Sequence, residues 1–178
     1  MKEERFSLKP FSGEGLHDIS ITGAVSRHSN RLSIEYELRA DMSEIVLPVR
    51  TEKPARRDML WKETCFEMFL APVGSEKYRE FNLSPSGHWN VYCFNSYRQG
   101  MREDDKFIEL PFKVEKSSKF LRLSLEAGTE IFMPGPCSFD IGITAVVRRG
   151  TGNAAYWALS HTVSEPDFHK RESFNITL

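Results

Sequence analysis

The amino-acid sequence predicts an all-β protein that folds as an antiparallel β-sandwich. Three observations support this prediction: short segments in which apolar and polar residues alternate, clusters of turn-forming residues between those segments, and no window with a sustained helical period. Roughly ten short strands separated by such turns are typical of a sandwich. The length of 178 residues suits a single domain over 1–178.

The expected strands follow from the period of their side chains. The first alternating segment is 18–27, DISITGAVSR. In 31–41, RLSIEYELRAD, every second residue from Leu32 to Leu38 is apolar, and the residues between them are polar. A period of two marks a strand with one buried face. Later strands are expected at 44–49, 64–72, 78–84, 89–97, 107–115, 120–127, 139–149, 154–161 and 173–178.

Turn signals separate these strands. Turns are expected at 13–15, 29–30, 84–87, 134–136 and 150–153, where Gly, Pro, Ser and Asn gather. In the turn at 84–87, Gly87 is expected to supply the positive φ angle. The charged segment 52–60 is expected to hold a short helical turn at most.

Composition excludes several classes of partner. The chain has 24 basic and 25 acidic side chains, a net charge of -1, and no long run of one sign, so we expect no nucleic-acid partner. No segment approaches the ~20 apolar residues of a membrane helix, and the N-terminus has no signal-peptide core, so no membrane association is expected. Cys65, Cys93 and Cys137 are odd in number and lack CxxC spacing, which indicates reduced thiols and a cytoplasmic location.

Catalytic motifs are weakly represented. The sequence has no P-loop, GxGxxG, GxSxG or HExxH pattern. Asp167 and His169 are two residues apart, on one side of an extended segment. They are either a base with its orienting partner, half of a metal site, or a structural hydrogen bond that fixes the last strand. An enzyme is therefore less expected than a binding protein.

Aromatic residues flanked by polar groups favour a saccharide platform. Trp61, Trp89 and Trp157 all have such neighbours. Sugar rings stack their C–H faces on aromatic rings, and their hydroxyls need planar donors and acceptors at the rim. A position in the sandwich core explains Trp89 equally well.

The stretch 80–104 combines core and site features. By strand periodicity Phe81 and Leu83 share one face, while Glu80 and Asn82 share the other. An Arg beside aromatic rings can stack on them and still offer its fork of donors. With Phe81 and Leu83 in the core, the residues expected to face a cleft are Glu80, Asn82, Tyr92 and Arg98.

Glu67 interrupts the most apolar strand, between Phe66 and Met68. A carboxylate in that position is paired with a base such as Arg98, bound to a metal, or directed into a polar concave face. Calcium remains open as a cofactor, because acids and backbone carbonyls are its ligands, but no EF-hand-type loop is present.

Three blocks carry a family resemblance: LWKETCFEMFLAP at 60–72, YREFNLSPSGHWNVYCFNSYRQGM at 78–101, and YWALSHTVSEPDFHKRESF at 156–174. The chain resembles bacterial DOMON-like proteins related to family 9 carbohydrate-binding modules. The resemblance implies a jelly-roll sandwich with a ligand cleft on the concave face of one sheet. The candidate ligand-binding residues are Trp61, Glu67, Glu80, Asn82, Trp89, Tyr92, Arg98, Trp157 and His169.

We therefore expect a non-catalytic protein that binds a small saccharide or a sugar-containing metabolite. One alternative is an enzyme that acts on carbohydrate, with Glu67 or Glu80 as acid or base and His169 assisting. Another is a haem-binding protein, since haem-binding relatives use Met and His as axial ligands. No pair is singled out by spacing among Met59, Met101, His88 and His161. A protein partner is the remaining alternative.

Overall fold

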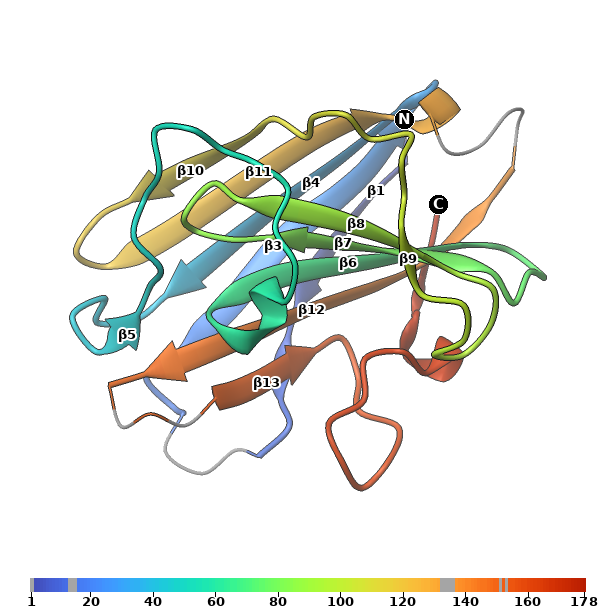
Figure 1. The fold of residues 1–178 in the computed structure, drawn as a ribbon. Helices are drawn as coiled ribbons and strands as arrows, with labels where there is room; N and C mark the ends of the chain where they lie inside the picture. Colours follow the sequence, from blue (N-terminus) through green and yellow to red (C-terminus); the bar gives the residue numbers. More distant parts are fainter. Residues whose placement is uncertain (1, 13–15, 132–136, 151, 153) are drawn as a thin grey trace.

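The structure is a computed structural model that describes residues 2–12, 16–131, 137–150, 152 and 154–178. Two antiparallel sheets pack face to face (Figure 1), which confirms the predicted β-sandwich. The smaller sheet has the order β1 (Lys2–Ser7), β3 (Ser20–His28), β4 (Arg31–Arg39), β11 (Phe120–Gly128), β10 (Phe112–Lys116). The larger sheet has the order β2 (Lys9–Pro10), β13 (Ala154–Ala158), β12 (Phe139–Arg149), β6 (Cys65–Pro72), β7 (Tyr78–Leu83), β8 (Trp89–Phe94), β9 (Arg102–Glu103). Short strands β5 (Ile45–Val46) and β14 (Ile176–Thr177) also pair with β12.

Helical structure in the described residues is limited to three single 3-10 turns. These are η1 (Leu60–Lys62), η2 (Thr129–Ile131) and η3 (Arg171–Ser173). No helix among the described residues has the length and apolar content that crossing a membrane requires. The charged segment expected to hold a short helical turn thus ends where η1 begins.

Most of the predicted strands are present, often shorter than expected. The predicted strand at 107–115 is wrong in its first half, because only Phe112–Lys116 pairs with β11. The turn at 84–87 forms as expected, with Gly87 at φ 99°. The turns predicted at 13–15 and 134–136 lie outside the described residues, as do Thr151 and Asn153 of the turn at 150–153.

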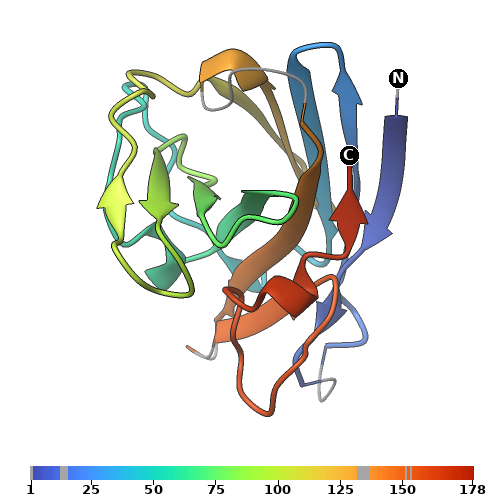
Figure 2. The same ribbon diagram turned by 90° about the vertical axis from the view of Figure 1, so that its right-hand side faces the viewer.

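Strand β1 has no counterpart among the predicted strands. It pairs with β3 along its whole length, from Lys2 opposite Arg27 to Ser7 opposite Thr22. In its sequence, KEERFS, Phe6 is the one buried residue, so there is no alternating pattern from which the strand could be predicted. Lys2 also donates to the carbonyl of Thr177, so the two ends of the described chain lie side by side (Figure 2).

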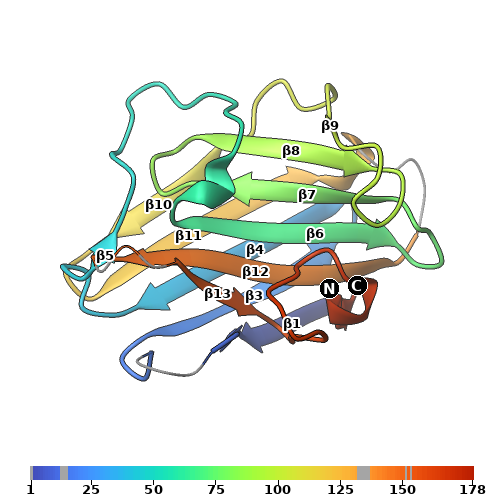
Figure 3. The same ribbon diagram turned by 60° about the horizontal axis from the view of Figure 1, so that its bottom comes forward.

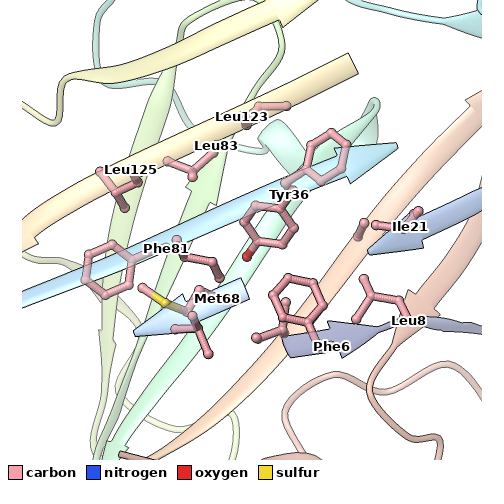
Figure 4. Close-up of a cluster of buried hydrophobic side chains, with 14 of the residues drawn as sticks. Phe6, Leu8, Ile21, Tyr36, Met68, Phe81, Leu83, Leu123 and Leu125 are labelled. Carbon is pink, nitrogen blue, oxygen red and sulfur yellow. The ribbon is translucent and has the colours of Figure 1, made fainter. Parts of the chain in front are cut away.

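The main core fills the space between the sheets. Alternate residues of each central strand point into it, as the period of two predicts. Figure 4 shows side chains that both sheets contribute to this core, among them Tyr36 and Leu123 of the smaller sheet and Phe81 and Met68 of the larger one. Tyr36 is fully buried, and its hydroxyl donates to the backbone carbonyl of Glu67 at 2.8 Å, so the one polar atom of this ring is satisfied.

A second apolar cluster lies on the outer face of the larger sheet, where the chain after β13 passes over it (Figure 3). Phe174 of this C-terminal segment packs there against Phe69 and Tyr78, and Phe168 of the same segment packs against Tyr156. Gly142 of β12 makes the close approach possible, because a Cβ atom at that position would lie 2.7 Å from Cδ1 of Phe174. The outer face is thus covered at one end, and a pocket forms beside the covering segment.

Candidate ligand-binding site

The pocket has a volume of about 310 Å³ and lies on the outer face of the larger sheet. Its floor comes from β6, β7, β8 and β12, and its walls come from η1, β13, the loop after β8 and the C-terminal segment. The lining residues are Trp61, Glu67, Glu80, Phe94, Arg98, Met101, Val146, Tyr156, Pro166, Phe168 and His169. Five of the nine residues predicted from the sequence therefore meet in one pocket: Trp61, Glu67, Glu80, Arg98 and His169.

Two carboxyl groups form the polar part of the floor. Glu67 on β6 is 2% exposed and Glu80 on β7 is 4% exposed. Glu67 pairs with Asn82 across the ladder, so Glu80 lies two residues along β7 on the same face, the diagonal position. The amide of Asn82 donates to Oε1 of Glu80 at 2.8 Å, and the hydroxyl of Thr144 donates to Oε2 of Glu67 at 3.3 Å.

The alternatives for Glu67 can now be separated. No Lys or Arg among the described residues forms an ion pair with it, and Arg98 pairs elsewhere. Its Oε1 is buried without a hydrogen-bond partner in the described part of the chain. Glu67 therefore presents an open acceptor in a polar pocket rather than a completed structural pair.

Both carboxyl groups hold protons more tightly than usual. Burial raises the pKa of Glu67 well above its ordinary value, and the neighbouring charge of Glu80 raises it further. Burial raises the pKa of Glu80 to about 7, although the Asn82 hydrogen bond and the charge of Arg98 oppose the shift. At neutral pH the floor therefore retains at least one proton.

His169 stands beside this pair as a neutral imidazole. Burial, assisted by the charge of Arg98, lowers the pKa of His169 to about 4. Its Nε2 lies 3.8 Å from Oε2 of Glu80, too far for a hydrogen bond, and the neutral ring makes no ion pair there. Its Nδ1 lies 2.8 Å from the hydroxyl of Tyr78, whose pKa burial raises to about 12. The tyrosine hydroxyl can donate to Nδ1, which leaves the imidazole hydrogen on Nε2, facing Glu80.

Arg98 connects the pocket mouth to the C-terminal segment. Its guanidinium donates to Oδ1 of Asp167 at 2.9 Å, and the hydroxyl of Tyr97 donates to the other oxygen at 2.6 Å. The backbone N–H of His169 donates to the same carboxylate at 3.0 Å. Of the three interpretations of Asp167 and His169, the structure contains the structural hydrogen bond. The donor is the backbone N–H of His169, not its imidazole ring.

Trp61 forms one wall of the pocket, and Tyr92 packs against its ring. Its ring makes an edge contact with Tyr92, with 5.6 Å between the ring centroids. Tyr92 is buried and does not line the pocket, and its hydroxyl donates to Asp58 at 2.6 Å and accepts from Asn90 at 2.8 Å. Tyr92 therefore positions Trp61, which the 3-10 turn η1 brings over β8.

The structure does not bring Trp89 and Trp157 to the pocket. They are 4% and 2% exposed and belong to the main core between the sheets. The guanidinium of Arg56 lies over the Trp89 ring, 4.6 Å from its centroid. The reason is that successive side chains of a strand face opposite sides of the sheet. Trp89 is next to Asn90 and Trp157 is next to Tyr156, and these two neighbours face outward, so both tryptophans face the core. Asn82 faces the pocket side but lies fully buried behind Glu80.

Several lining residues were not predicted from the sequence. They are Phe94, Met101, Val146, Tyr156, Pro166 and Phe168. Tyr156 pairs with Val146 across β12 and β13, so both side chains lie on the pocket face while Trp157 faces the core. Alternation from Trp157 would have found Tyr156 once Trp157 was taken as core, and alternation from Tyr92 would have found Phe94.

The geometry of the described residues adds little support for calcium or haem as a cofactor. No cluster of three or more His, Cys, Asp or Glu side chains in the described residues has the arrangement of a metal site. Met101 lines the pocket, whereas His88 bonds to the backbone of Ala55 and His161 to the carbonyl of Lys9. Met59 is 45% exposed outside the pocket lining.

Comparison with known proteins supports the fold. No protein-family model matches the chain, and no curated protein matches its sequence. The crystal structure of a candidate carbohydrate-binding protein from Bacteroides uniformis superimposes with a TM-score of 0.74 at 11% identity, over 96% of this chain and 83% of that one. A family 9 carbohydrate-binding module from Caldicellulosiruptor kristjanssonii, in complex with cellotriose, gives a TM-score of 0.52 at 9% identity, over 88% of this chain and 72% of that one. The chain thus has the β-sandwich fold of these two proteins.

Proposed function

We propose that the chain is a non-catalytic protein that binds a small saccharide or a sugar-containing metabolite in the pocket on the larger sheet. The observation that carries the proposal is the combination of aromatic walls with a buried polar floor in one pocket. The structural neighbours add support, since one is a candidate carbohydrate-binding protein and the other a carbohydrate-binding module with cellotriose bound.

The proposal gives each lining group a role. Trp61 and Tyr156 would stack on the face of a sugar ring, because both line the pocket and retain exposed surface. Glu67, Glu80 and Arg98 would hydrogen-bond its hydroxyls. Asn82 would act through Glu80, which it orients. The cytoplasmic location and the DOMON-like kinship stay predictions.

A thermal-shift screen against mono- and oligosaccharides and sugar phosphates tests the proposal. A ligand at about a hundred times its dissociation constant stabilises the native state by about 2.7 kcal/mol. In a domain of this size each kcal/mol moves the midpoint by roughly 2–4 °C, so binding should be visible. The shift should disappear in Trp61→Ala and persist in Ile108→Ala, a truncation of a side chain that is 92% exposed and outside the pocket lining. A flat result across the panel would contradict the proposal and direct the search to a protein partner.

A second candidate function is an enzyme that acts on carbohydrate. One observation favours it: Glu80, with a pKa raised to about 7, can serve as a general acid at neutral pH beside the neutral His169. Release of nitrophenol from a panel of nitrophenyl glycosides tests it. Activity that is lost in Glu80→Gln would establish this reading, and no release by the wild-type protein would reject it.

A further inference from the structure

One buried carboxyl oxygen on the floor of the pocket lacks a hydrogen-bond partner among the described residues. Glu67 lines the pocket, and its Oε1 is buried and has no hydrogen-bond partner in the described residues. A buried acceptor without a partner costs free energy that a ligand donor would recover. The opposite oxygen of Glu67 already accepts from Thr144, so Oε1 is the atom left for a ligand.

Within the described part of the chain, the two carboxyl groups of the floor also have no cationic side chain in direct contact. Among the described residues, no Lys or Arg contacts Glu67 or Glu80, and the one guanidinium in the pocket wall, Arg98, is engaged by Asp167 at 2.9 Å. His169 is neutral and 3.8 Å away. Two carboxyl groups at low dielectric without a counter-cation favour a positively charged ligand group over a neutral one.

The walls suit the same ligand. Trp61, Tyr156 and Phe168 line the walls, and Phe94 lies beside the carboxyl groups on the floor. The electron-rich faces of aromatic rings attract an ammonium group. The combination of an apolar, ring-lined wall with an acidic floor therefore accepts a ring that carries an amine.

We infer that the pocket is built for an amino sugar, whose protonated amine donates to Oε1 of Glu67. The ammonium group then replaces the proton that the Glu67–Glu80 pair holds. This inference rests on the proposed saccharide-binding function and narrows its ligand class. It predicts that binding near pH 6 releases a proton, because the floor must ionise to accept the ammonium group.

The surroundings of the pair leave the carboxyl groups as the titrating site. The titratable groups that interact electrostatically with the pair are Tyr36 of β4, Cys65 of β6, Tyr78 of β7, Tyr92 of β8 and Arg98 of the following loop; His169 of the C-terminal segment lies 3.8 Å from Glu80, and Asp167 acts on His169. The tyrosine and cysteine pKa values are raised, that of Asp167 is lowered, and that of His169 is about 4. A proton released on binding near pH 6 therefore comes from the Glu67–Glu80 pair.

Isothermal titration calorimetry of the whole chain provides the test. The probes are glucosamine, galactosamine and mannosamine, each beside its parent hexose, together with N-acetylglucosamine. At least one amino sugar should bind about tenfold or more tightly than its neutral counterparts, the range of a hydrogen bond to a charged group. Titrations near pH 6 in two buffers of different ionisation enthalpy should show proton release, and the affinity should rise between about pH 5.5 and 7.

Variants locate the effect. Glu67→Gln should remove the preference for the amine while the parent hexose still binds, and Glu109→Gln, an exposed carboxylate, should change neither. Equal affinity for amino sugars and parent hexoses, or a preference that survives in Glu67→Gln, would overturn the inference and leave the proposed function standing. If no sugar of either kind binds, both fail. Should Glu67→Gln not fold, the wild-type titration still decides, because binding without proton release contradicts the inference.

Discussion

Glu67 of β6 faces Asn82 of β7 directly across the antiparallel ladder, on the side of the sheet turned away from the main core. This pairing places Glu80, two residues before Asn82, diagonally opposite Glu67. Asn82 satisfies one oxygen of Glu80 at 2.8 Å, and none of the described residues satisfies Oε1 of Glu67. A register that buries two carboxyl groups and leaves one acceptor open is costly for folding alone, which is the physical ground for assigning the pocket to a ligand.

Glu80 and His169 should give opposing pH dependences of stability. The folded pKa of Glu80 is about 7 against an ordinary value of 4.5, so the folded state keeps a proton that the unfolded chain loses. The free energy of unfolding therefore falls as pH rises from about 4.5 to 7. The folded pKa of His169 is about 4 against 6.5, so stability falls as pH drops from about 6.5 to 4. The two contributions have opposite signs between about pH 4.5 and 6.5, and the raised pKa of Glu67 adds a slope of the same sign as that of Glu80.

Single substitutions should change the pH dependence of the free energy of unfolding in opposite directions. Relative to the wild-type protein, the slope of the free energy of unfolding between pH 4.5 and 6.5 should become more positive in Glu80→Gln and more negative in His169→Asn, by up to about 1.4 kcal/mol per pH unit for each proton. Urea titrations at several pH values measure both. Parallel pH profiles for the two variants would show that the pKa values are not displaced in this way.

Arg56 should contribute strongly to stability, because its guanidinium ties the 104–107 loop to β8. It donates to Asn90 Oδ1 at 2.7 Å and to the carbonyls of Asp104 at 2.9 Å and Phe107, and it lies over the Trp89 ring. Arg56→Met should lower the free energy of unfolding by about 2–4 kcal/mol, since several buried acceptors lose their donor.

Arg57→Met is the matched control for Arg56→Met. The side chain of Arg57 is exposed, so this variant should change stability by less than about 0.5 kcal/mol. Chemical denaturation of both variants makes the comparison. Equal effects would mean that the Arg56 contacts add nothing specific.

Gly142→Ala should damage the pocket from a distance. The added methyl group would lie 2.7 Å from Cδ1 and 3.0 Å from Cε1 of Phe174, so the C-terminal segment must shift. Because that segment also carries Asp167 and His169, both stability and ligand affinity should fall, with a stability loss of about 1–3 kcal/mol. Gly128→Ala, where an added Cβ meets nothing within 4 Å, is the control. Unchanged affinity in Gly142→Ala would show that the segment does not shape the site.

The sequence predicted most of the fold because its strands alternate cleanly. Leu32, Ile34, Tyr36 and Leu38 point into the core, and Phe81 and Leu83 do so from the other sheet. Strand β1 could not be found this way, since an edge strand with one buried residue has no alternation. Its place is decided by backbone pairing with β3, a long-range contact that local pattern does not encode.

The site was predicted in part, and the errors on β8 and β13 have one physical origin. Tyr92 and Trp89 are an odd number of residues apart on β8, so both cannot face the same side of the sheet. Which face of the larger sheet carries the pocket depends on the register of β7 with β6 and on the C-terminal segment that covers one face. Trp157 and Tyr156 exchange roles for the same reason. The irregular segment carrying Pro166 and Phe168 has no periodicity from which its position could be derived.

The most direct test uses the three tryptophans, which the structure separates by position. Trp61 lines the pocket, while Trp89 and Trp157 are buried in the main core. In ¹⁵N-labelled protein the three indole N–H signals are assigned with Trp61→Phe, Trp89→Phe and Trp157→Phe, and the saccharide with the largest thermal shift is titrated in. The account predicts a progressive, saturable shift of the Trp61 signal and little change in the other two. If the Trp61 signal stays fixed at saturation while a core signal moves, the saccharide site lies elsewhere and the central claim is wrong.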